Sequence, residues 1–382
     1  MRQDGFLIML PGPTNVPDRV LRAMCKPLIG HRGPEFRGLH ERIVENARYA
    51  FQTEADVFVL TCSGTGGVAC ALENVLQPGD EVVVPVMGVF SERMAETARR
   101  RGAKVVEVPV AWGSALTREQ VEPFMHEGVK ALCLVYNETS TGAIARELPA
   151  LAELAKEHGA LVVVDAVSVL GGDVLPVDEW GIDICVTGSQ KCLACPPGLA
   201  LVSVGEEAWR AIDANQHKPF YFDLVRAREF LRERCETPFT PAIPLFYALD
   251  EALAMLREEG LEKRIERHAR CARAFYAAIK ALGLRAFPEP RWRSQTVIAI
   301  EVPKGVNSRA LRSAMKERYG VLIGGGMGKL RERIIRIGCM GIVSAREVLI
   351  TVSALEDCLR DLGLPVEAGA GSEAAKRELG LL

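Results

Sequence analysis

The chain has 382 residues, of which 48% are hydrophobic and 25% are charged. This amount of apolar material fills the core of one large or two ordinary domains, so disorder is excluded as the main state. The 47 basic residues are balanced by 49 acidic ones, and a net charge of -2 offers no excess of positive charge to a nucleic acid or an anionic membrane.

Seven short apolar runs begin at residue 56 and alternate with amphipathic stretches. Each run is rich in valine and apolar on successive residues, which is typical of strands buried on both faces. Stretches between them, such as 91–101 and 147–159, have helical patterns. This alternation predicts an α/β fold with a mostly parallel seven-stranded sheet between helices. The runs are 56–60, 81–86, 104–110, 131–136, 161–167, 183–188 and 199–204.

The pattern changes near residue 245. A charged, alanine-rich stretch from about Phe246 to Leu282 predicts one long helix between two domains. The segments after it predict a smaller α+β domain, with strands near 296–303, 321–326 and 333–338 and a helix near 308–320. We therefore expect a large domain with an N-terminal arm at 1–260 and a small C-terminal domain at 261–382. Residues 367–382 are expected to fray.

In an open parallel sheet, ligands bind beyond the carboxyl ends of the strands. The first such segment is the glycine-rich stretch 61–67, which contains Ser63, Gly64 and Thr65 and precedes a predicted helix. Unpaired N–H groups at a helix start attract an anionic oxygen, and glycines let it approach closely. The stretch predicts a phosphate-binding turn, with an ordinary glycine-rich connection as the alternative. It has neither the lysine of a P-loop nor the glycine spacing of a dinucleotide-binding turn.

Two charged residues follow later strands. Asp165 ends the apolar run LVVVD, where a carboxylate requires a cationic or strongly donating partner; a helix cap is the alternative. Lys191 follows the run 183–188, where burial would make its amine a nucleophile; a solvated surface lysine is the alternative. A phosphate turn, a carboxylate and a lysine are together the anchors that pyridoxal phosphate requires for its phosphate, ring nitrogen and aldehyde.

With these anchors the chain resembles the class V aminotransferases of the fold type I pyridoxal-phosphate enzymes, and most closely the serine–pyruvate and alanine–glyoxylate aminotransferases. The resemblance covers nearly the whole length, and the order of the motifs is more specific than any one of them. The motifs are Pro11-Gly12-Pro13-Thr14-Asn15-Val16-Pro17, Ser63-Gly64-Thr65, Glu138-Thr139-Ser140-Thr141-Gly142, Val164-Asp165-Ala166-Val167-Ser168, Gly188-Ser189-Gln190-Lys191 and Arg336-Ile337-Gly338.

The resemblance implies a role for each anchor. Lys191 would hold the cofactor as a Schiff base and then carry the proton between substrate and cofactor. Asp165 would pair with the protonated pyridine nitrogen. Phe90 would stack on the pyridine ring, at a position where many relatives carry tryptophan.

The same resemblance assigns the phosphate and the ring hydroxyl. Ser63, Gly64 and Thr65 would hold the phosphate, with Gln190 beside it. Ser140 would lie near the ring hydroxyl.

Three further positions are implied for the substrate and for a second subunit. Arg336 would bind the substrate α-carboxylate through a planar fork of donors, and Gly12 would lie near the same carboxylate. Thr240 matches a segment with which a neighbouring subunit completes the phosphate site. A homodimer with shared active sites is therefore implied.

The implied reaction moves the amino group of a small amino acid, serine or alanine, to a 2-oxo acid, glyoxylate or pyruvate, by a ping-pong mechanism. Within the fold, the alternatives are a lyase such as a cysteine desulfurase and transaminases for ureidoglycine, aminoethylphosphonate or pyridoxamine. Desulfurases stack a histidine where this chain has Phe90, and pyridoxamine transaminases normally lack an intact phosphate turn. A non-catalytic subunit of a larger assembly is the alternative from another class.

The 11 cysteines are scattered along a long chain, which predicts free thiols in a reducing cytoplasm. Cys192 and Cys195 form a C-x-x-C without a second ligand pair, so no metal site is predicted. The start of the chain has no secretion-signal pattern, and no apolar run reaches the roughly 18 residues of a membrane span. We expect a soluble cytoplasmic protein that binds neither membranes nor nucleic acids.

Two further segments have open interpretations. Gly324-Gly325-Gly326-Met327-Gly328 is unusually rich in glycine and close to Arg336, which suggests a flap over the substrate. His31-Arg32 either lines the substrate entrance or has a local structural role.

Overall fold

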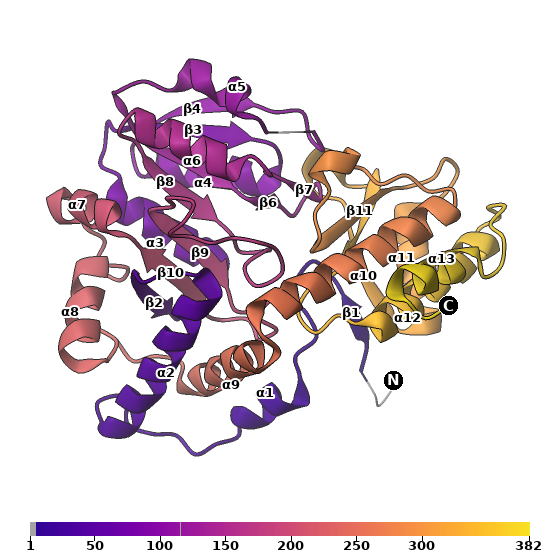
Figure 1. The fold of residues 1–382 in the computed structure, drawn as a ribbon, viewed down its shortest axis with the longest axis horizontal. Coiled ribbons are helices and arrows are strands. Elements are labelled where there is room, and N and C mark those ends of the chain that lie inside the picture. The colour runs from indigo at the N-terminus through magenta and orange to yellow at the C-terminus, as the bar shows by residue number, and fades with distance from the viewer. Residues whose placement is uncertain (1–4, 115) are drawn as a thin grey trace.

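The computed structural model describes residues 5–114 and 116–382, and a seven-stranded sheet forms the centre of its larger lobe (Figure 1). Each predicted apolar run forms one strand of this sheet: β2 (Asp56–Leu60), β3 (Glu81–Val86), β4 (Lys104–Pro109), β5 (Val129–Val135), β8 (Leu161–Asp165), β9 (Ile184–Gly188) and β10 (Ala200–Val204). The order across the sheet is β2-β10-β9-β8-β5-β3-β4. Strand β10 runs antiparallel to both of its neighbours, and the other pairs are parallel. The predicted α/β architecture is confirmed.

The helices connect these strands and build the smaller lobe. Their bounds are α1 (Asp18–Ala23), α2 (Pro34–Phe51), α3 (Gly64–Val75), α4 (Val89–Arg100), α5 (Arg118–Val121), α6 (Leu148–Glu157), α7 (Glu206–Ala214), α8 (Leu224–Arg234), α9 (Ile243–Glu259), α10 (Leu261–Ala281), α11 (Ser308–Ala314), α12 (Ala345–Asp361) and α13 (Ala370–Leu379). Shorter turns are the 3-10 helices η1 (Glu122–Phe124), η2 (Pro290–Trp292) and η4 (Gly328–Leu330) and the π-helical turn η3 (Met315–Tyr319).

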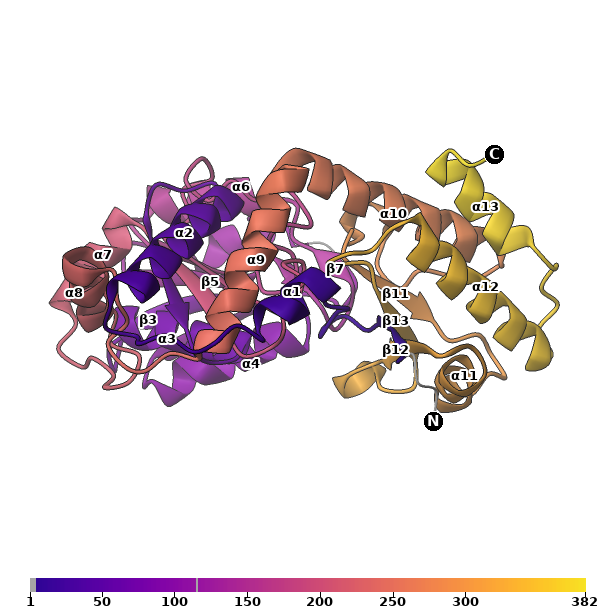
Figure 2. The same ribbon diagram turned by 90° about the horizontal axis from the view of Figure 1, so that it is seen from below.

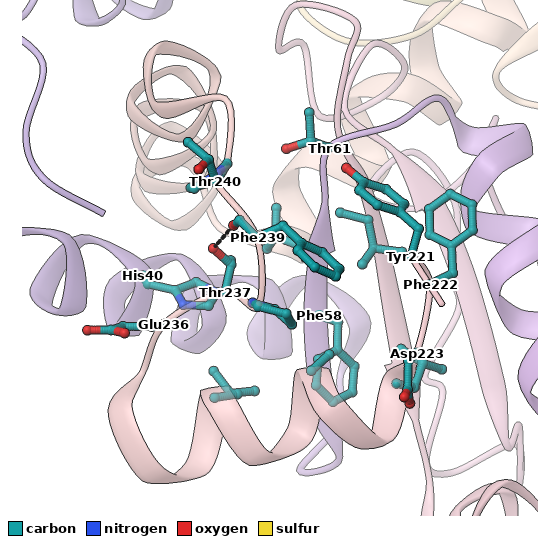
Figure 3. Close-up of a pocket in the computed structure, with 17 residues that line it drawn as sticks. His40, Phe58, Thr61, Tyr221, Phe222, Asp223, Glu236, Thr237, Phe239 and Thr240 are labelled. Carbon is teal, nitrogen blue, oxygen red and sulfur yellow. Dashed lines mark hydrogen bonds between the residues drawn. The ribbon is translucent and has the colours of Figure 1, made fainter. Parts of the chain in front are cut away.

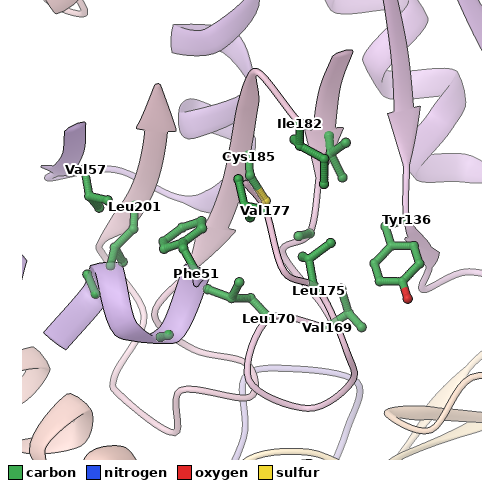
Figure 4. Packing of buried hydrophobic residues seen from close by; sticks show 14 of the residues in the cluster. Phe51, Val57, Tyr136, Val169, Leu170, Leu175, Val177, Ile182, Cys185 and Leu201 are labelled. Atoms are coloured by element: carbon green, nitrogen blue, oxygen red, sulfur yellow. The ribbon is translucent and has the colours of Figure 1, made fainter. Parts of the chain in front are cut away.

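Both faces of the large sheet are buried, which explains why its strands are apolar on successive residues. On one face, residues of α2, α6 and α9 share a core with strand residues, and Figure 4 shows Phe51 of α2 among side chains that include Val57 and Leu201. On the other face, α3, α4 and α7 pack against residues such as Val163 and Val202. The sheet is therefore a rigid platform for whatever its carboxyl edge holds.

The smaller lobe contains a four-stranded sheet with the order β1-β12-β13-β11. Its strands are β1 (Leu7–Met9), β11 (Val297–Glu301), β12 (Val321–Gly325) and β13 (Ile334–Gly338). Strand β1 comes from the N-terminal arm and pairs in parallel with β12, so the two ends of the chain meet in this lobe. The expected domain boundary at residue 260 falls between α9 and α10, which run from the large lobe into the small one (Figures 1 and 2).

Two sequence-based expectations about helices are wrong. The single helix expected between Phe246 and Leu282 is divided at Gly260, whose φ of +83° is readily adopted only by glycine. The tail expected to fray forms α13, and its Ala375 and Leu379 are buried against the core of the small lobe. The residues that α13 buries recur at helical spacing, but composition alone concealed this pattern.

The fold brings the ends of several strands to one edge. A two-stranded ribbon, β6 (Asn137–Glu138) with β7 (Ala143–Ile144), follows β5 at this edge. Val135 of β5 and Val186 of β9 both lie beside Asp165 in the strand register. Among the helices of the described residues, none is long and apolar enough to cross a membrane.

Candidate active site

A cavity of about 130 Å³ opens at the carboxyl edge of the large sheet. It unites seven of the residues predicted from the sequence, namely Ser63, Gly64, Thr65, Phe90, Asp165, Gln190 and Lys191. Its other lining residues are Arg93, Val135, Asn137, Thr139 and Val167. The predicted strand-end residues, far apart in the sequence, therefore share one cavity.

Lys191 is a buried amine at the floor of this cavity. Its Nζ donates a hydrogen bond to the carbonyl oxygen of Pro11, and burial lowers its pKa to about 8. Gly12 has a φ of +89°, and a Cβ there would lie 2.6 Å from Cε of Lys191. Position 12 therefore has to be glycine for the lysine to occupy its place, and a lowered pKa leaves a larger fraction of the amine unprotonated and nucleophilic.

Asp165 supplies a carboxylate to the same cavity. Burial raises its pKa to about 6, while the backbone N–H of Val167, which donates to Oδ1 at 2.9 Å, and the charge of Lys191 lower it. The negative charge of Glu138 acts in the same direction as burial. A carboxylate in this setting gains stability from a cationic partner.

The predicted phosphate turn forms the start of α3. Ser63 is the N-cap, and its Oγ accepts a hydrogen bond from the N–H of Gly66 at 3.3 Å. A Cβ at Gly64 would lie 2.8 Å from a methyl carbon of Val167, so the backbone approaches the next loop closely. Gln190 completes the set with an Oε1 that is buried and has no hydrogen-bond partner among the described residues.

The position of Phe90, the residue expected to stack on the cofactor ring, depends on a buried carboxylate to which the sequence assigned no role. Glu138 is fully buried and accepts hydrogen bonds from the backbone N–H groups of Phe90 and Ser91, at the start of α4. It also accepts a hydrogen bond of 2.6 Å from the hydroxyl of Ser140. Glu138 is thus placed to fix the backbone that carries Phe90.

Ser140, which the resemblance implied near the ring hydroxyl, does not itself line the cavity. It is fully buried behind the cavity wall, bonded to Glu138, and its Oγ accepts from the N–H of Val89. Thr139, the preceding residue, lines the cavity. Residues 139–142 form a turn, in which the N–H groups of Thr141 and Gly142 donate to the carbonyl oxygen of Glu138. Within this turn Thr139 lines the cavity, whereas the hydroxyl of Ser140 faces Glu138.

Arg336 of β13 brings a guanidinium from the small lobe to the border of the cavity. Its Nη1 donates to the carbonyl oxygen of Thr139 at 2.9 Å, and its Nε donates to that of Gly325 at 2.8 Å. Burial lowers its pKa to about 10, so it is charged at neutral pH. Within residues 5–114 and 116–382, no carboxylate forms an ion pair with it. A buried cation without a counter-ion is a natural site for a substrate carboxylate.

Thr240 lies outside this cavity. It is exposed and belongs to a second pocket, between the end of β2 and the loops at residues 221–223 and 236–241 (Figure 3). Arg32 supports this loop, because its guanidinium donates to the carbonyl oxygens of Thr237 and Pro238. Of the two interpretations of His31-Arg32, these contacts favour the structural one for Arg32.

The glycine-rich stretch and the C-x-x-C are structural in this fold. Gly324 and Gly325 are residues of β12 that pair with Arg336 and Ile335 of β13, so this half of the suggested flap is part of a sheet. Cys192 and Cys195 are buried, unpaired thiols, and burial raises the pKa of Cys192 to about 12. A neutral buried thiol is a poor nucleophile and a poor metal ligand. The described residues contain no cluster of His, Cys, Asp or Glu suited to a metal ion.

The sequence interpretation assigned no role to three residues that line the cavity, and a signal existed for two of them. Asn137 and Thr139 follow the run 131–136 directly, at a strand end where function was expected. Arg93 lies one helical turn after the start of α4, and no local pattern distinguishes it from the other arginines of that helix. Only the packing of α4 beside α3 places Arg93 at the cavity.

The residues present fit pyridoxal phosphate. The start of α3 suits the phosphate, the carboxylate of Asp165 suits a protonated ring nitrogen, and the amine of Lys191 suits the aldehyde. The buried Oε1 of Gln190, which has no partner among the described residues, can accept a hydrogen bond. Phe90 offers an aromatic face at the cavity wall.

Comparison with known proteins places these features in a family. The model of the aminotransferase class-V family matches residues 8–330. An uncharacterized aminotransferase of Methanocaldococcus jannaschii is 42% identical over 98% of this chain and 97% of its own length. A protein of Synechococcus sp. named as the small subunit of a soluble hydrogenase is 39% identical over 99% of both chains. A serine–glyoxylate aminotransferase of Methylorubrum extorquens is 36% identical over 97% of this chain and 95% of its own length.

The fold agrees with these sequence matches. The crystal structure of ureidoglycine–glyoxylate aminotransferase from Bacillus subtilis superposes with a TM-score of 0.95 at 34% identity, over 100% of this chain and 99% of that one. The match therefore includes both lobes and the cavity between the strand ends. The chain belongs to the class V aminotransferases and is a pyridoxal-phosphate enzyme of fold type I.

Proposed function

We propose that this aminotransferase moves the amino group of a small amino acid, serine or alanine, to glyoxylate or pyruvate. The observation that carries the proposal is a buried amine, Lys191, together with a buried guanidinium, Arg336, which has no carboxylate within ion-pair distance among the described residues. Both contact the wall of one cavity, since Arg336 donates to the backbone of Thr139, which lines it. An α-amino acid presents an amine and a carboxylate to these two groups.

Each residue then has a defined task. Bound pyridoxal phosphate supplies an electron sink for the electron pair left when the substrate Cα loses its proton. Arg336 would bind and orient the α-carboxylate, and Lys191 would accept and carry the proton of Cα. Asp165 would pair with a protonated ring nitrogen, and Phe90 would offer its aromatic face to the ring. The same residues serve both half-reactions, as ping-pong transfer requires.

A donor screen tests the proposal without knowledge of the acceptor. The cofactor-loaded protein is mixed with serine, alanine, aspartate, ureidoglycine, aminoethylphosphonate, pyridoxamine or cysteine, and loss of the visible absorption of the lysine-bound cofactor is followed. We expect serine or alanine to react fastest and glyoxylate or pyruvate to restore the absorption. Fastest reaction with another donor would exclude the proposed substrate class but not the aminotransferase activity.

The same screen addresses the two competing roles. A desulfurase would release sulfide from cysteine without amino transfer, and the position expected to stack on the ring carries Phe90 instead of the histidine of those enzymes. The name of the Synechococcus relative favours a role as a subunit of an assembly. Failure of every donor, in protein that binds the cofactor normally, would support that role.

Asp165→Asn is expected to weaken catalysis more than cofactor binding. Asparagine keeps the acceptor for the Val167 N–H but loses the charge that holds the ring nitrogen protonated, so kcat should fall about 10²- to 10³-fold. Kinetics of the first half-reaction and cofactor titration together measure the two effects.

The same substitution should stabilise the cofactor-free protein. Because folding raises the pKa of Asp165 from 3.8 to about 6, the folded state binds more protons between these values, and wild-type stability falls as pH rises through this window. Above pH 6 the variant should be more stable than wild type by about 1 to 3 kcal/mol. Denaturant unfolding at pH 4 and pH 7 measures this difference, and lower stability of the variant at pH 7 would contradict it.

The proposed functional unit is a homodimer in which Thr240 of one subunit completes the phosphate site of the other. An exposed aromatic surface supports this: Phe220 and Tyr221 are 75% and 52% exposed, and the ring of Tyr221 stacks on that of Phe239 at 5.4 Å. These residues border the loop that carries Thr240, and Figure 3 shows Tyr221, Phe239 and Thr240 around one pocket. Exposed aromatic side chains that lie together in this way are typical of a subunit interface.

Phe220→Asp is expected to convert the dimer into monomers and to weaken cofactor binding. A carboxylate buried in an apolar interface has no partner, and the desolvation cost opposes association. Sedimentation velocity measures the mass, with Phe6→Asp, an exposed phenylalanine of the small lobe, as the matched control. A wild-type protein that sediments as a monomer at micromolar concentration, or a Phe220→Asp variant that remains dimeric, would contradict this arrangement.

A further inference from the structure

One cation at the cavity has no acidic partner. Arg93 of α4 lines the cavity, while Arg99 and Arg100 of the same helix pair with Glu107 and Glu96 on the surface. In the part of the chain that the structure describes, no carboxylate lies within ion-pair distance of Arg93. Its charge is therefore available to an anion in the cavity.

Two contacts hold the Arg93 side chain in this position. Its Nη1 donates a hydrogen bond of 3.0 Å to Oγ1 of Thr65, in the first turn of α3. Its guanidinium carbon lies 4.8 Å from the centroid of the Phe90 ring, a cation–π distance. The arginine thus bridges the phosphate turn and the aromatic wall.

The bond to Thr65 determines what the threonine hydroxyl can do. A hydroxyl has one proton to donate and two lone pairs that accept. The Arg93 N–H occupies a lone pair, so the proton of Thr65 is directed away from Arg93 and is free for another acceptor. The unpaired N–H groups of the α3 start favour an anionic oxygen at this place.

We propose that Arg93 is a positioning residue of the phosphate site: it orients the Thr65 hydroxyl as a donor to the cofactor phosphate and adds a positive charge beside it. The proposal rests on the assignment of the phosphate to Ser63, Gly64 and Thr65, but not on the identity of the amino donor or acceptor. It adds the full positive charge of a guanidinium to the partial positive charge of the helix start, within one subunit.

Pyridoxamine 5′-phosphate and pyridoxamine separate this role from a general structural one. Neither forms a covalent bond with Lys191, and they differ only by the phosphate. For Arg93→Gln, equilibrium titration of cofactor-free protein should show about 10- to 100-fold weaker binding of pyridoxamine 5′-phosphate. The affinity falls because the substitution removes the positive charge and one charge-assisted hydrogen bond. Pyridoxamine should bind within about threefold of its wild-type affinity.

Control variants define the path of the effect. Arg100→Gln removes an exposed arginine of the same helix and should leave both affinities unchanged. Thr65→Val removes the hydroxyl, and adding Arg93→Gln to it should cost less than in wild type, because the two residues act together. Arg93→Lys should recover part of the affinity through its charge.

Three results would overturn the proposal: unchanged binding of pyridoxamine 5′-phosphate by Arg93→Gln, an equal loss for both ligands, or full additivity with Thr65→Val. No amino-acid substrate is involved in these titrations, so a donor screen that fails leaves them valid. If wild-type protein binds pyridoxamine 5′-phosphate no better than pyridoxamine, the phosphate assignment itself is wrong, and the proposal fails with it.

Discussion

Lys191→Ala is expected to reduce amino transfer by about 10³- to 10⁴-fold, because the substitution removes both the Schiff-base amine and the group that carries the proton. The lysine lies in a place that Gly12 leaves open for it, and its pKa of about 8 keeps an appreciable fraction of the amine neutral near neutral pH. Single-turnover reaction with serine or alanine measures the loss. The visible absorption of the lysine-bound cofactor should be absent.

The fold and the phosphate turn should remain intact in this variant. Pyridoxamine 5′-phosphate is therefore expected to bind Lys191→Ala within about threefold of wild type, as measured by equilibrium titration. Added methylamine should restore part of the proton transfer, because a small amine can occupy the vacated place. Lys104→Ala, at an exposed position of β4, is the matched control. Full turnover by Lys191→Ala would exclude the proposed chemistry.

Arg336→Lys is expected to lower kcat/KM for the amino donor by about 10²- to 10³-fold, since an ammonium group cannot reproduce the two-pronged binding of a carboxylate. The guanidinium donates through Nε to the carbonyl oxygen of Gly325 and through Nη1 to that of Thr139. These two bonds fix the plane of the guanidinium. A lysine at this position also places its charge less favourably. Half-reaction kinetics with serine measure the effect.

Ethanolamine separates a carboxylate-binding role from general damage to the site. It is serine without its carboxylate, so its slow reaction should be nearly the same in wild type and Arg336→Lys. The ratio of the serine and ethanolamine rates should therefore fall with the substitution. Arg331→Lys, at an exposed position before β13, serves as the control. An equal loss for both amines would show that Arg336 supports the structure and does not bind the carboxylate.

The role of buried Glu138 in supporting Phe90 was harder to predict from the sequence than the position of Lys191. The carboxylate accepts hydrogen bonds from Phe90, Ser91 and Ser140, which belong to segments about 50 residues apart in the sequence. A Cβ at Gly88 would collide with its side chain, so the glycine before α4 is part of the same arrangement. No local pattern reports a contact between two distant segments, and the motif that contains Glu138 did not reveal this role.

By itself, the sequence determined the seven-stranded α/β sheet and the anchors at its edge. Strands buried on both faces must be apolar on successive residues, and parallel strands place their carboxyl ends together, so Ser63, Asp165 and Lys191 were predictable from position. The pairing of β1 with β12 was not, because it joins segments remote in the chain. The break at Gly260 and the helix α13 have local signals, a glycine and a helical spacing of buried residues, but the charged and alanine-rich composition concealed them.

Only the tertiary structure decided which polar side chains face the cavity. It placed Thr139 there and turned the hydroxyl of Ser140, the next residue of the same turn, toward Glu138. It also brought Arg93 to Thr65 through the packing of α4 beside α3. Among the residues that the structure describes, it placed no carboxylate within ion-pair distance of Arg336. The physical reason is common to all three: orientation and charge pairing depend on neighbours in space, whereas the sequence specifies only neighbours along the chain.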